Sequence, residues 1–318
     1  FNDWTYPNFI ELMKQLNVED EDSDMSFSVQ NEKTGLEYNG HNLNTLFAQR
    51  LNLFKPKFIG MIQDILRFNK EATQEYLNNE LDQEETLSQY LNRKGYGPSF
   101  VENYIVPMGA AIWSSSEKTM MTFPVFFFIR FFHHHGMLSV DDRPQWRVLK
   151  NGSKSYVDRI TKGFEQNIYL STPVASVKRF DDRVEIESTR GTEAYDEVIL
   201  ACHSDQALGM LSDASEAEKS ILNAIPYQKN DVVLHTDKTL LPTKKLAWAA
   251  WNYHIPKEAK DRVAVTYNMN ILQNFDDCPE VFCVSLNKND DIDPNKIIKK
   301  YEYDHPIFTV EGSLAQQR

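Results

Sequence analysis

The chain has 318 residues, of which 41% are hydrophobic and 25% are charged, so it can bury a core the size of roughly two ordinary domains. Its formal net charge of −12 argues against nucleic-acid binding, because an acidic surface repels phosphate backbones. The three cysteines form no CxxC pair and favour a reducing cytoplasm over a disulfide framework. No run of 18 apolar residues predicts a transmembrane segment.

The first part of the chain, residues 1–148, is predicted to be a mostly helical layer with a few strands. Thr5 is expected to cap a first helix, with Pro7 in its first turn. The apolar face of that helix consists of Phe9, Leu12, Met13 and Leu16. Alternating apolar and polar residues over 25–29 predict a strand, and Asn39-Gly40 marks a turn.

Further helices are expected in the same layer. Residues 56–79 have a helical pattern whose buried stripe is expected to contain Ile59, Ile62 and Leu66. Thr86 and Gln89 have the spacing of a capping box, in which each side chain bonds the other residue's backbone N–H. The very apolar stretch 98–138 is expected to be helical in large part.

The pattern changes at residue 151. Asn151-Gly152-Ser153 is expected to open a helix with a buried face of Tyr156, Ile160 and Phe164. Residues 168–180 and 184–187 flank Asp181-Asp182 and predict a β-hairpin. Residues 197–202 are nearly all apolar and predict a buried strand, in which Cys202 would be a small buried residue.

The last third of the chain favours a sheet. Ser215 and Glu218 form a second capping-box pair, which opens a helix to about Ile225. Strand candidates then follow closely on one another, at 232–236, 246–253, 263–269 and 281–286. Closely spaced strands joined by short connections predict an antiparallel sheet.

Motifs for phosphate binding do not occur in these residues. Gly95-Tyr96-Gly97 is the one GxG sequence, and Phe100 stands where a dinucleotide fingerprint requires its third glycine. No GxxxxGK[ST] loop and no GxSxG nucleophile elbow are present. These 318 residues therefore cannot build a pyrophosphate cradle by the usual glycine-rich turn.

Two groups of ring side chains suggest binding. His133-His134-His135 could not share one metal ion on a helix, because successive residues point about 100° apart; cavity lining or packing is favoured and no metal is predicted. Trp251 and Tyr253 share one face of the predicted strand 246–253, whereas Trp248 faces the other way. They would form an aromatic wall that lines an apolar channel, or simply part of the core.

A family resemblance is carried by residues 152–208. This segment combines a glycine-led helix, a strand with Val174 and Val177, a hairpin, and an Asp196-Glu-Val-Ile-Leu-Ala201 strand. It resembles the flavin-dependent amine-oxidase superfamily, which includes monoamine oxidases, phytoene desaturases and protoporphyrinogen oxidases. The stretches 1–8, 24–28, 107–114 and 305–306 resemble one bacterial branch, whose relatives are fused or adjacent to cyclopropane fatty-acyl synthases.

The resemblance implies an α+β fold: a helical layer with an antiparallel substrate-domain sheet, plus the middle portion of a Rossmann-like domain for the cofactor FAD. The implied limits are 1–148 and 213–305 for the substrate domain, and 149–212 and 306–318 for the FAD domain. In the family, glycine-rich and second FAD-contacting motifs lie outside the stretch matched here. These 318 residues are therefore expected to bind FAD poorly and to be inactive alone.

The resemblance also implies site residues. The backbone of Val174 would meet the adenine, Gly152 and Ser153 would form the turn before the helix near the cofactor, and Ala201 would lie beside the flavin. Relatives have proline two residues after this alanine, where this chain has His203. The expected substrate-lining residues are Trp113, Trp248, Trp251, Tyr253 and Tyr267.

The implied activity is hydride transfer from a substrate C–H to flavin N5, in a cytoplasmic bacterial enzyme. The substrate would be an amine or a lipid or fatty-acyl chain, and amine oxidation, desaturation and isomerisation all stay open. No catalytic residue is identified. The alternative is a non-catalytic lipid- or partner-binding protein that retains the fold.

Overall fold

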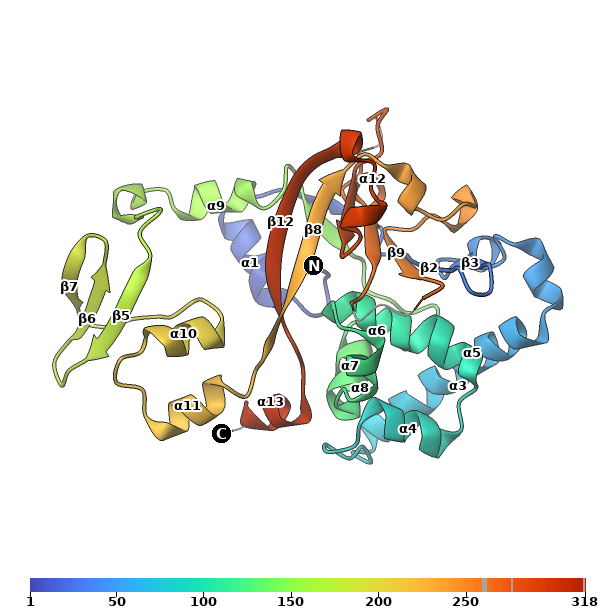
Figure 1. Ribbon diagram of the computed structural model, residues 1–318, viewed down its shortest axis with the longest axis horizontal. Coiled ribbons are helices and arrows are strands. Elements are labelled where there is room, and N and C mark those ends of the chain that lie inside the picture. Colours follow the sequence, from blue (N-terminus) through green and yellow to red (C-terminus); the bar gives the residue numbers. More distant parts are fainter. Residues whose placement is uncertain (259–261, 276, 317) are drawn as a thin grey trace. The chain divides into compact units, whose positions relative to one another are not determined.

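The computed structural model describes residues 1–258, 262–275, 277–316 and 318, and it shows the predicted combination of helices and sheets. The chain forms two compact units (Figure 1). The larger unit contains residues 1–156 and 228–305, and the smaller one contains 157–227 and 306–318. No helix in the described part of the chain has both the length and the apolar character needed to cross a membrane.

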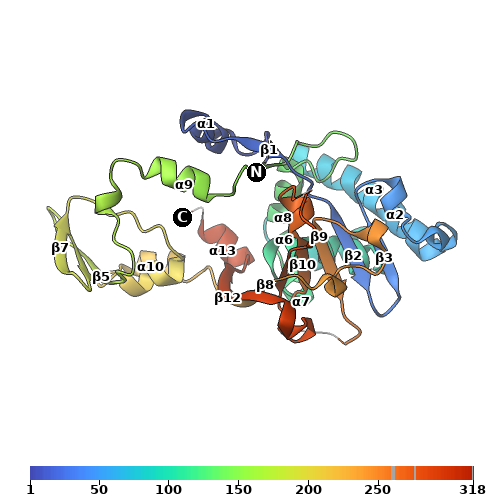
Figure 2. The same cartoon turned by 90° about the horizontal axis from the view of Figure 1, so that it is seen from above.

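A seven-stranded sheet organises the larger unit (Figure 2). In spatial order its strands are β12 (Ile297–Pro306), β8 (Tyr227–His235), β11 (Cys283–Leu286), β10 (Val265–Asn268), β9 (Trp251–Ile255), β2 (Phe27–Asn31) and β3 (Leu36–Asn39). From β8 to β9 each pair is antiparallel, as the sequence predicted. Strand β2 runs parallel to β9, so the sheet as a whole is mixed.

Strand β12 is the longest strand of the sheet and was not predicted. Most of its residues are exposed on both faces of the sheet, so its sequence lacks the apolar alternation by which strands are recognised. The predicted strand 246–253 begins later than expected, at Trp251, because residues 245–247 form the 3₁₀ helix η5 (Lys245–Ala247).

Most of the helices of the larger unit form a layer apart from the sheet (Figures 1 and 2). They are α2 (Leu43–Leu46), the 3₁₀ helix η1 (Arg50–Phe54), α3 (Pro56–Leu77), α4 (Leu87–Lys94), α5 (Pro98–Phe100), the π-helix η2 (Val101–Ile105), α6 (Val106–Trp113), α7 (Glu117–Met121) and α8 (Val125–His134). The capping box of Thr86 and Gln89 at α4 is confirmed. The stripe predicted for α3 was wrong: Phe58, Met61, Phe68 and Ala72 are buried, whereas Leu66 is exposed.

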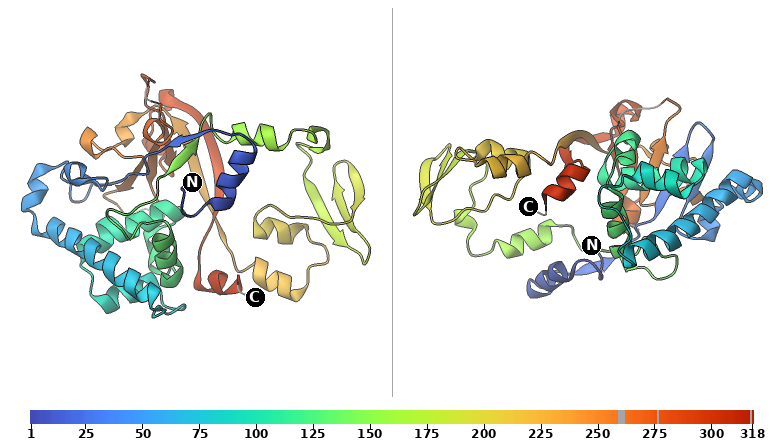
Figure 3. Two further views of the ribbon diagram at one scale, coloured as in Figure 1. Left: turned by 180° about the vertical axis from the view of Figure 1, so that it is seen from behind. Right: turned by 90° about the horizontal axis from the view of Figure 1, so that it is seen from below.

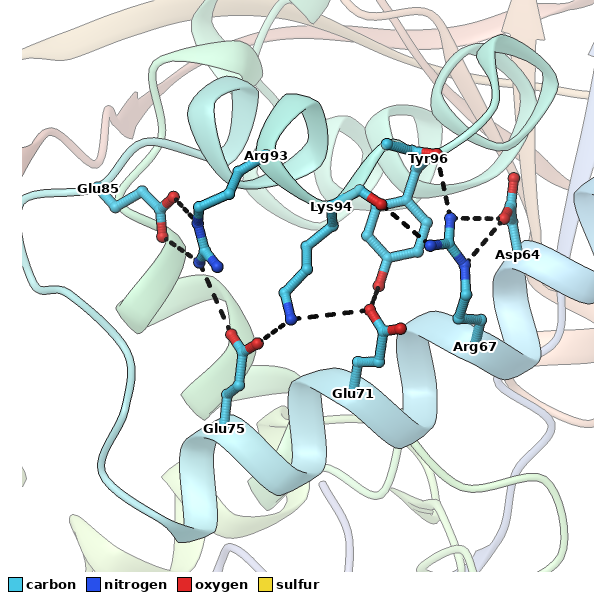
Figure 4. A network of polar contacts seen from close by, with 9 residues as sticks. Asp64, Arg67, Glu71, Glu75, Glu85, Arg93, Lys94 and Tyr96 are labelled. Carbon is cyan, nitrogen blue, oxygen red and sulfur yellow. Dashed lines mark hydrogen bonds and ion pairs between the residues drawn. The ribbon is translucent and has the colours of Figure 1, made fainter.

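Helix α3 is joined to α4 by a row of alternating charges (Figure 4). Arg93 of α4 makes a two-pronged contact with Glu85, at 2.8 and 2.9 Å. Lys94 pairs with Glu75 of α3, and the Tyr96 hydroxyl donates to Glu71 at 2.9 Å. Several linked charges hold a geometry better than one exposed ion pair does, so this row fixes the two helices against each other.

The first helix, α1 (Pro7–Gln15), packs Met13 against Val18 and Leu149. Its expected apolar residues Phe9, Leu12 and Leu16 surround that cluster. The expected cap was wrong, since Tyr6 is the N-cap residue and Thr5 instead donates to the side chain of Asn2 at 2.9 Å. A short antiparallel pair, β1 (Asp20–Asp22) and β4 (Arg147–Leu149), follows beside it.

The smaller unit contains a three-stranded antiparallel sheet and short helices (Figure 3). Its elements are the 3₁₀ helix η3 (Glu165–Asn167), β5 (Val174–Arg179), β6 (Val184–Ser188), β7 (Gly191–Tyr195), α10 (Ser204–Met210), α11 (Glu216–Leu222) and α13 (Val310–Ala315). The predicted hairpin is β5–β6, and the capping box of Ser215 and Glu218 at α11 is confirmed.

Two predictions in this region were wrong. Residues 197–202 form no strand; Ile199 is 91% exposed and Cys202 is exposed, because no neighbouring strand among the described residues pairs with them. On helix α9 (Lys154–Ile160) the expected buried face is only partly formed: Tyr156 is half-buried against the cluster at α1, whereas Ile160 and Phe164 are exposed. In both places the sequence supplies apolar side chains that this part of the chain does not cover.

Candidate functional site

One face of the seven-stranded sheet carries a row of apolar side chains that crosses four strands. Trp251 of β9 is opposite Tyr267 of β10, Tyr267 is opposite Val284 of β11, and Val284 is opposite Leu234 of β8. Residues that face each other across antiparallel strands project to the same side of a sheet. These four side chains, which we call the apolar shelf, are all only half-buried.

The shelf has an unsatisfied hydrogen-bond donor. The indole of Trp251 meets the ring of Tyr267 edge-to-face, with centroids 4.8 Å apart. The Trp251 Nε1 is buried and has no acceptor among the described residues. An unpaired buried N–H is unfavourable, and an oxygen of a bound molecule would satisfy it.

The next row of the same face is closed. Tyr253 lies between Val29 and Val265 and is buried with them. Burial raises the pKa of the Tyr253 phenol, and the negative charge of Glu117 at the start of α7 raises it further. Tyr253 is therefore a neutral, buried residue beside the shelf and is not part of its open surface.

The helices cover this face at the β2 and β3 side. The Tyr38 hydroxyl donates to the backbone oxygen of Asn103 in η2 at 2.7 Å, and Asn31 donates to the Asn103 side chain at the same distance. Because both Tyr38 and Asn31 project from the apolar face, η2 packs on that side. The half-buried row lies farther along the sheet, on β9, β10, β11 and β8.

The remaining tryptophans of the expected substrate site lie elsewhere. Trp113 is buried at the end of α6. The centroid of its ring is 4.4 Å from that of Phe123 and 5.1 Å from that of Phe131, so Trp113 belongs to the core of the helical layer. Trp248 precedes β9 and donates to the backbone oxygen of Pro242 at 2.8 Å. Of the expected substrate residues, the structure brings together Trp251, Tyr253 and Tyr267.

The sequence alone did not identify Val284 and Leu234 as part of the shelf. Alternation within β8 and β11 places Leu234 with Val232, and Val284 with Leu286, on one face. That signal was available, but the register that aligns these strands with Trp251 depends on pairing across the sheet.

The opposite face of the sheet is polar and closed. Asn252 accepts hydrogen bonds from Ser28 at 2.8 Å and from the backbone N–H of Ala249 at 3.0 Å. Its amide donates to the backbone oxygens of Ala249 and Thr266. All of these side chains are buried, so this polar face is a structural layer with its hydrogen bonds satisfied.

A histidine continues that layer on the next strands. The hydroxyls of Ser285 and Thr266 are 2.7 Å apart, and Ser285 is 2.8 Å from His235 Nε2. The backbone N–H of Asp237 donates to His235 Nδ1, so the ring proton must be on Nε2 and is donated to Ser285. Burial lowers the pKa of His235 to about 4, which keeps the ring neutral near pH 7.

The three consecutive histidines line a separate hollow in the larger unit, as the sequence favoured. Its volume is about 1070 Å³, and its lining also includes Trp4, Tyr6 and Asp142. The ring of His135 stacks on that of Phe131, with centroids 3.9 Å apart. The Nε2 atom of His134 is 3.0 Å from the Tyr76 hydroxyl oxygen. Burial lowers the pKa of His133 and of His135. Among the described residues, no group of three or more potential ligands is arranged to hold a metal ion.

The residues that the resemblance assigned to the cofactor occur in both units. In the larger unit, Gly152 has a φ of +75° in the turn before α9, and Ser153 follows it. The position of a Cβ on Gly152 would be in open space. A backbone that is free of side-chain cover allows close approach of a ligand.

In the smaller unit, Val174 begins β5, and the pairing with β6 is irregular between Val174 and Ser176. The outer edge of β5 bonds to Ser212 at Val177, and no strand of the described chain covers it at Val174. Ala201 lies in the exposed segment after Ile199. This unit thus offers a strand edge and uncovered apolar side chains, among them Leu170, which is 84% exposed.

Comparisons with known proteins identify a family and similar folds. A family described as flavin containing amine oxidoreductase matches residues 1–263. The fold is similar to that of putrescine oxidase bound to putrescine, with a TM-score of 0.62 at 12% identity, covering 99% of this chain and 78% of the other. No curated protein sequence matches the chain.

Two further solved structures have the same fold. A fatty acid isomerase from P. acnes that produces CLA has a TM-score of 0.65 at 13% identity, over 98% of this chain and 75% of that one. Cyclohexylamine oxidase from Brevibacterium oxydans IH-35A has a TM-score of 0.64 at 10% identity, over 99% and 78%. At these identities the likeness establishes the fold, and substrates must be argued from the site.

Proposed function

This chain belongs to the flavin-containing amine oxidoreductase family, with FAD as its cofactor, and we propose that it oxidises or rearranges a lipid or fatty-acyl chain that lies on the apolar shelf. When bound, FAD supplies the redox chemistry by accepting a hydride from a substrate C–H at its N5 atom. The residues of this chain bind the substrate, orient it and exclude water.

The fit to the cofactor rests on the smaller unit and on the Gly152 turn. An adenine ring needs a flat apolar surface and backbone partners for its nitrogens. The uncovered edge of β5 at Val174 offers the backbone groups, and exposed apolar residues of the same unit offer the surface. Val174 and Ala201 are the candidate FAD-binding residues of the smaller unit, and Gly152 and Ser153 are separate candidates in the larger unit.

The shelf is the observation that favours a lipid. Trp251, Tyr267, Val284 and Leu234 present a continuous apolar row, and burying such surface is favourable by about 25 cal/mol per Å². The unpaired Trp251 Nε1 needs an acceptor, which a carbonyl or carboxylate oxygen of a lipid provides. A protonated amine has only donors and would leave this N–H unpaired.

An amine substrate is the second candidate, because the aromatic rings of Trp251 and Tyr267 on the shelf can attract a substrate ammonium. Two of the similar structures are named as amine oxidases and one as a fatty acid isomerase, so the names support both candidates.

The test uses the full-length protein loaded with FAD. Long-chain fatty acids and primary amines are added separately under anaerobic conditions, while the visible absorption of the flavin is followed. Bleaching of the flavin by a fatty acid supports a lipid oxidase or desaturase, and double-bond migration without net bleaching supports an isomerase. Bleaching by amines alone contradicts the lipid proposal.

A full-length protein that never takes up FAD contradicts the enzyme proposal and favours the non-catalytic alternative. We also expect residues 1–318 alone to bind FAD weakly, because they contain no glycine-rich pyrophosphate turn. Isothermal titration with FAD measures this directly, and tight binding by these residues would show that the expectation is wrong.

A further inference from the structure

A group of large apolar side chains is exposed at the start of the helical layer, away from the shelf. Leu43 of α2 is 75% exposed, and in η1 Leu51 is 74% and Phe54 is 79% exposed. Leu53, between them, is 54% exposed. Isolated exposed leucines are ordinary, but four such residues within twelve positions are characteristic of a contact surface.

Hydrogen bonds and one aromatic contact fix the backbone that carries these side chains. Asn42 and Thr45 form a capping box at the start of α2. The Gln49 side chain accepts from Asn52 at 3.0 Å and donates to the backbone oxygen of Gly35 at 2.8 Å. Phe47 packs inward on the ring of Phe58, at 5.7 Å. The segment therefore has its own buried anchor, and the exposed leucines and Phe54 are not required for it.

The same segment has a charge opposite to that of the whole chain. Residues 38–63 contain no Asp or Glu, although the chain has a net charge of −12. Arg50, Lys55 and Lys57 are all exposed beside the apolar side chains. Arg50 donates to neutral oxygens of Asn44 and Phe47, and no ion pair to the two lysines occurs within the described ranges.

We propose that this surface, formed by Leu43, Leu51, Leu53 and Phe54 with Arg50, Lys55 and Lys57, docks the protein onto an anionic lipid membrane. The apolar side chains would enter the boundary between headgroups and acyl chains, and the three cations would contact lipid phosphates and carboxylates. The protein lies on the membrane in this arrangement and does not cross it.

Charge decides among the possible occupants of the surface. A second copy that docked through the same surface would bring three cations against three cations. An anionic bilayer matches both the positive charge and the projecting apolar groups. It also repels the net negative charge of the chain, which favours approach through this positive face.

The experiment measures sedimentation of the protein with vesicles of phosphatidylcholine, either pure or with about one third phosphatidylserine. We expect binding to the anionic vesicles only, and weaker binding as salt is raised. The double variant Lys55→Gln/Lys57→Gln should bind about 25-fold more weakly, at about five-fold for each charge lost near the surface. The double variant Leu51→Ser/Phe54→Ser should lose at least about ten-fold.

Leu77→Ser is the matched control. Leu77 is 61% exposed at the other end of α3, close in sequence to Glu75 and Glu80, and its replacement should leave vesicle binding unchanged. All variants alter exposed side chains and should melt at the wild-type temperature by circular dichroism. Flavin content is recorded separately, so membrane docking and the proposed enzyme activity succeed or fail independently.

Several results would overturn the proposal. These are the absence of vesicle binding, equal binding to pure phosphatidylcholine, or equal losses in the Leu77→Ser control. A wild-type protein that self-associates in solution and becomes monomeric in Leu51→Ser/Phe54→Ser would instead assign the surface to a second copy. Binding of an acidic protein that is lost in both double variants, without any vesicle binding, would assign it to a protein partner.

Discussion

The two faces of the seven-stranded sheet differ in the burial and in the hydrogen bonding of their side chains. On the polar face, Asn252, Thr266, Ser285 and His235 are buried and bonded to one another or to backbone. On the apolar face, the row from Trp251 to Leu234 is half-open and retains an unpaired donor. A satisfied polar layer contributes to stability and specifies the fold, whereas an open apolar row with an unmet hydrogen bond is suited to a ligand.

The largest effect is expected from Asn252→Ala on the polar face. This change removes four hydrogen bonds and leaves buried partners unpaired, so the free energy of unfolding should fall by about 3–5 kcal/mol. Urea unfolding measures the loss. Ser28→Ala, which removes one hydroxyl, is the control and should cost about 1 kcal/mol. If Asn252→Ala lowers the free energy of unfolding by less than about 1 kcal/mol, the polar face does not have this structural role.

The second effect is a pH dependence that also belongs to the polar face. Because the folded pKa of His235 is lowered to about 4, the unfolded chain binds a proton between roughly pH 6.5 and pH 4 while the folded protein does not. The contribution of His235 to the free energy of unfolding is fully present above about pH 6.5. Between about pH 6.5 and pH 4 it decreases by about 1.4 kcal/mol for each unit that the pH falls.

The measurement compares urea unfolding of the wild type and of His235→Gln from pH 7 to pH 4.5. The difference in free energy between the two proteins should shrink by up to about 3 kcal/mol over that range, because only the wild type has this titrating ring. Asp237, Lys288 and Lys296 are the charged groups that act on His235, and all three remain in both proteins. Parallel pH profiles would show that His235 is not responsible.

The apolar face should respond in function and not in stability. Trp251→Phe keeps most of the ring surface but removes the unpaired Nε1–H. In the FAD-loaded full-length protein, we expect the substrate KM to rise about ten-fold, the value of one lost hydrogen bond to a ligand oxygen. Unfolding should change by less than about 1 kcal/mol. An unchanged KM together with a large loss of stability would remove the shelf as a binding surface.

The smallest effect is expected from Trp248→Phe, which is the matched tryptophan control. Its indole is already bonded to the backbone oxygen of Pro242, so the change should cost about 0.5–1.5 kcal/mol of stability. The KM should stay at the wild-type value. A change in KM as large as that of Trp251→Phe would mean that Trp248 also contacts the substrate, as the sequence first suggested.

Local chemistry predicted much of the fold. The capping boxes at Thr86 and Ser215 and the hairpin around Asp181 depend on residues three or four apart, and all three occur as expected. Properties that depend on residues far apart in the sequence were harder to predict. The predictions that residues 197–202 are buried and that Ile59, Ile62 and Leu66 form the buried stripe of α3 were wrong. Burial is decided by what packs against an element and not by the element's own pattern.

The candidate site divides in the same way. The aromatic residues of β9 and β10 were identified by composition and alternation, since Trp251 and Tyr267 stand out in any apolar strand. Val284 and Leu234 could not be added without the register of the sheet. His235 was missed because its sequence neighbours carry no motif, and its partner Ser285 is fifty positions away.

The interleaving of the two units has a consequence for how the chain folds during synthesis. The larger unit needs residues 228–305, and the smaller unit, begun at residue 157, needs 306–318 as well. In the smaller unit, Gly312 of α13 lies against the backbone oxygen of Ala224, so closely that a Cβ there would be 2.9 Å from it. Neither unit can reach its final form early on the ribosome, and nascent chains that have not yet reached about residue 305 should depend on chaperones to stay unaggregated.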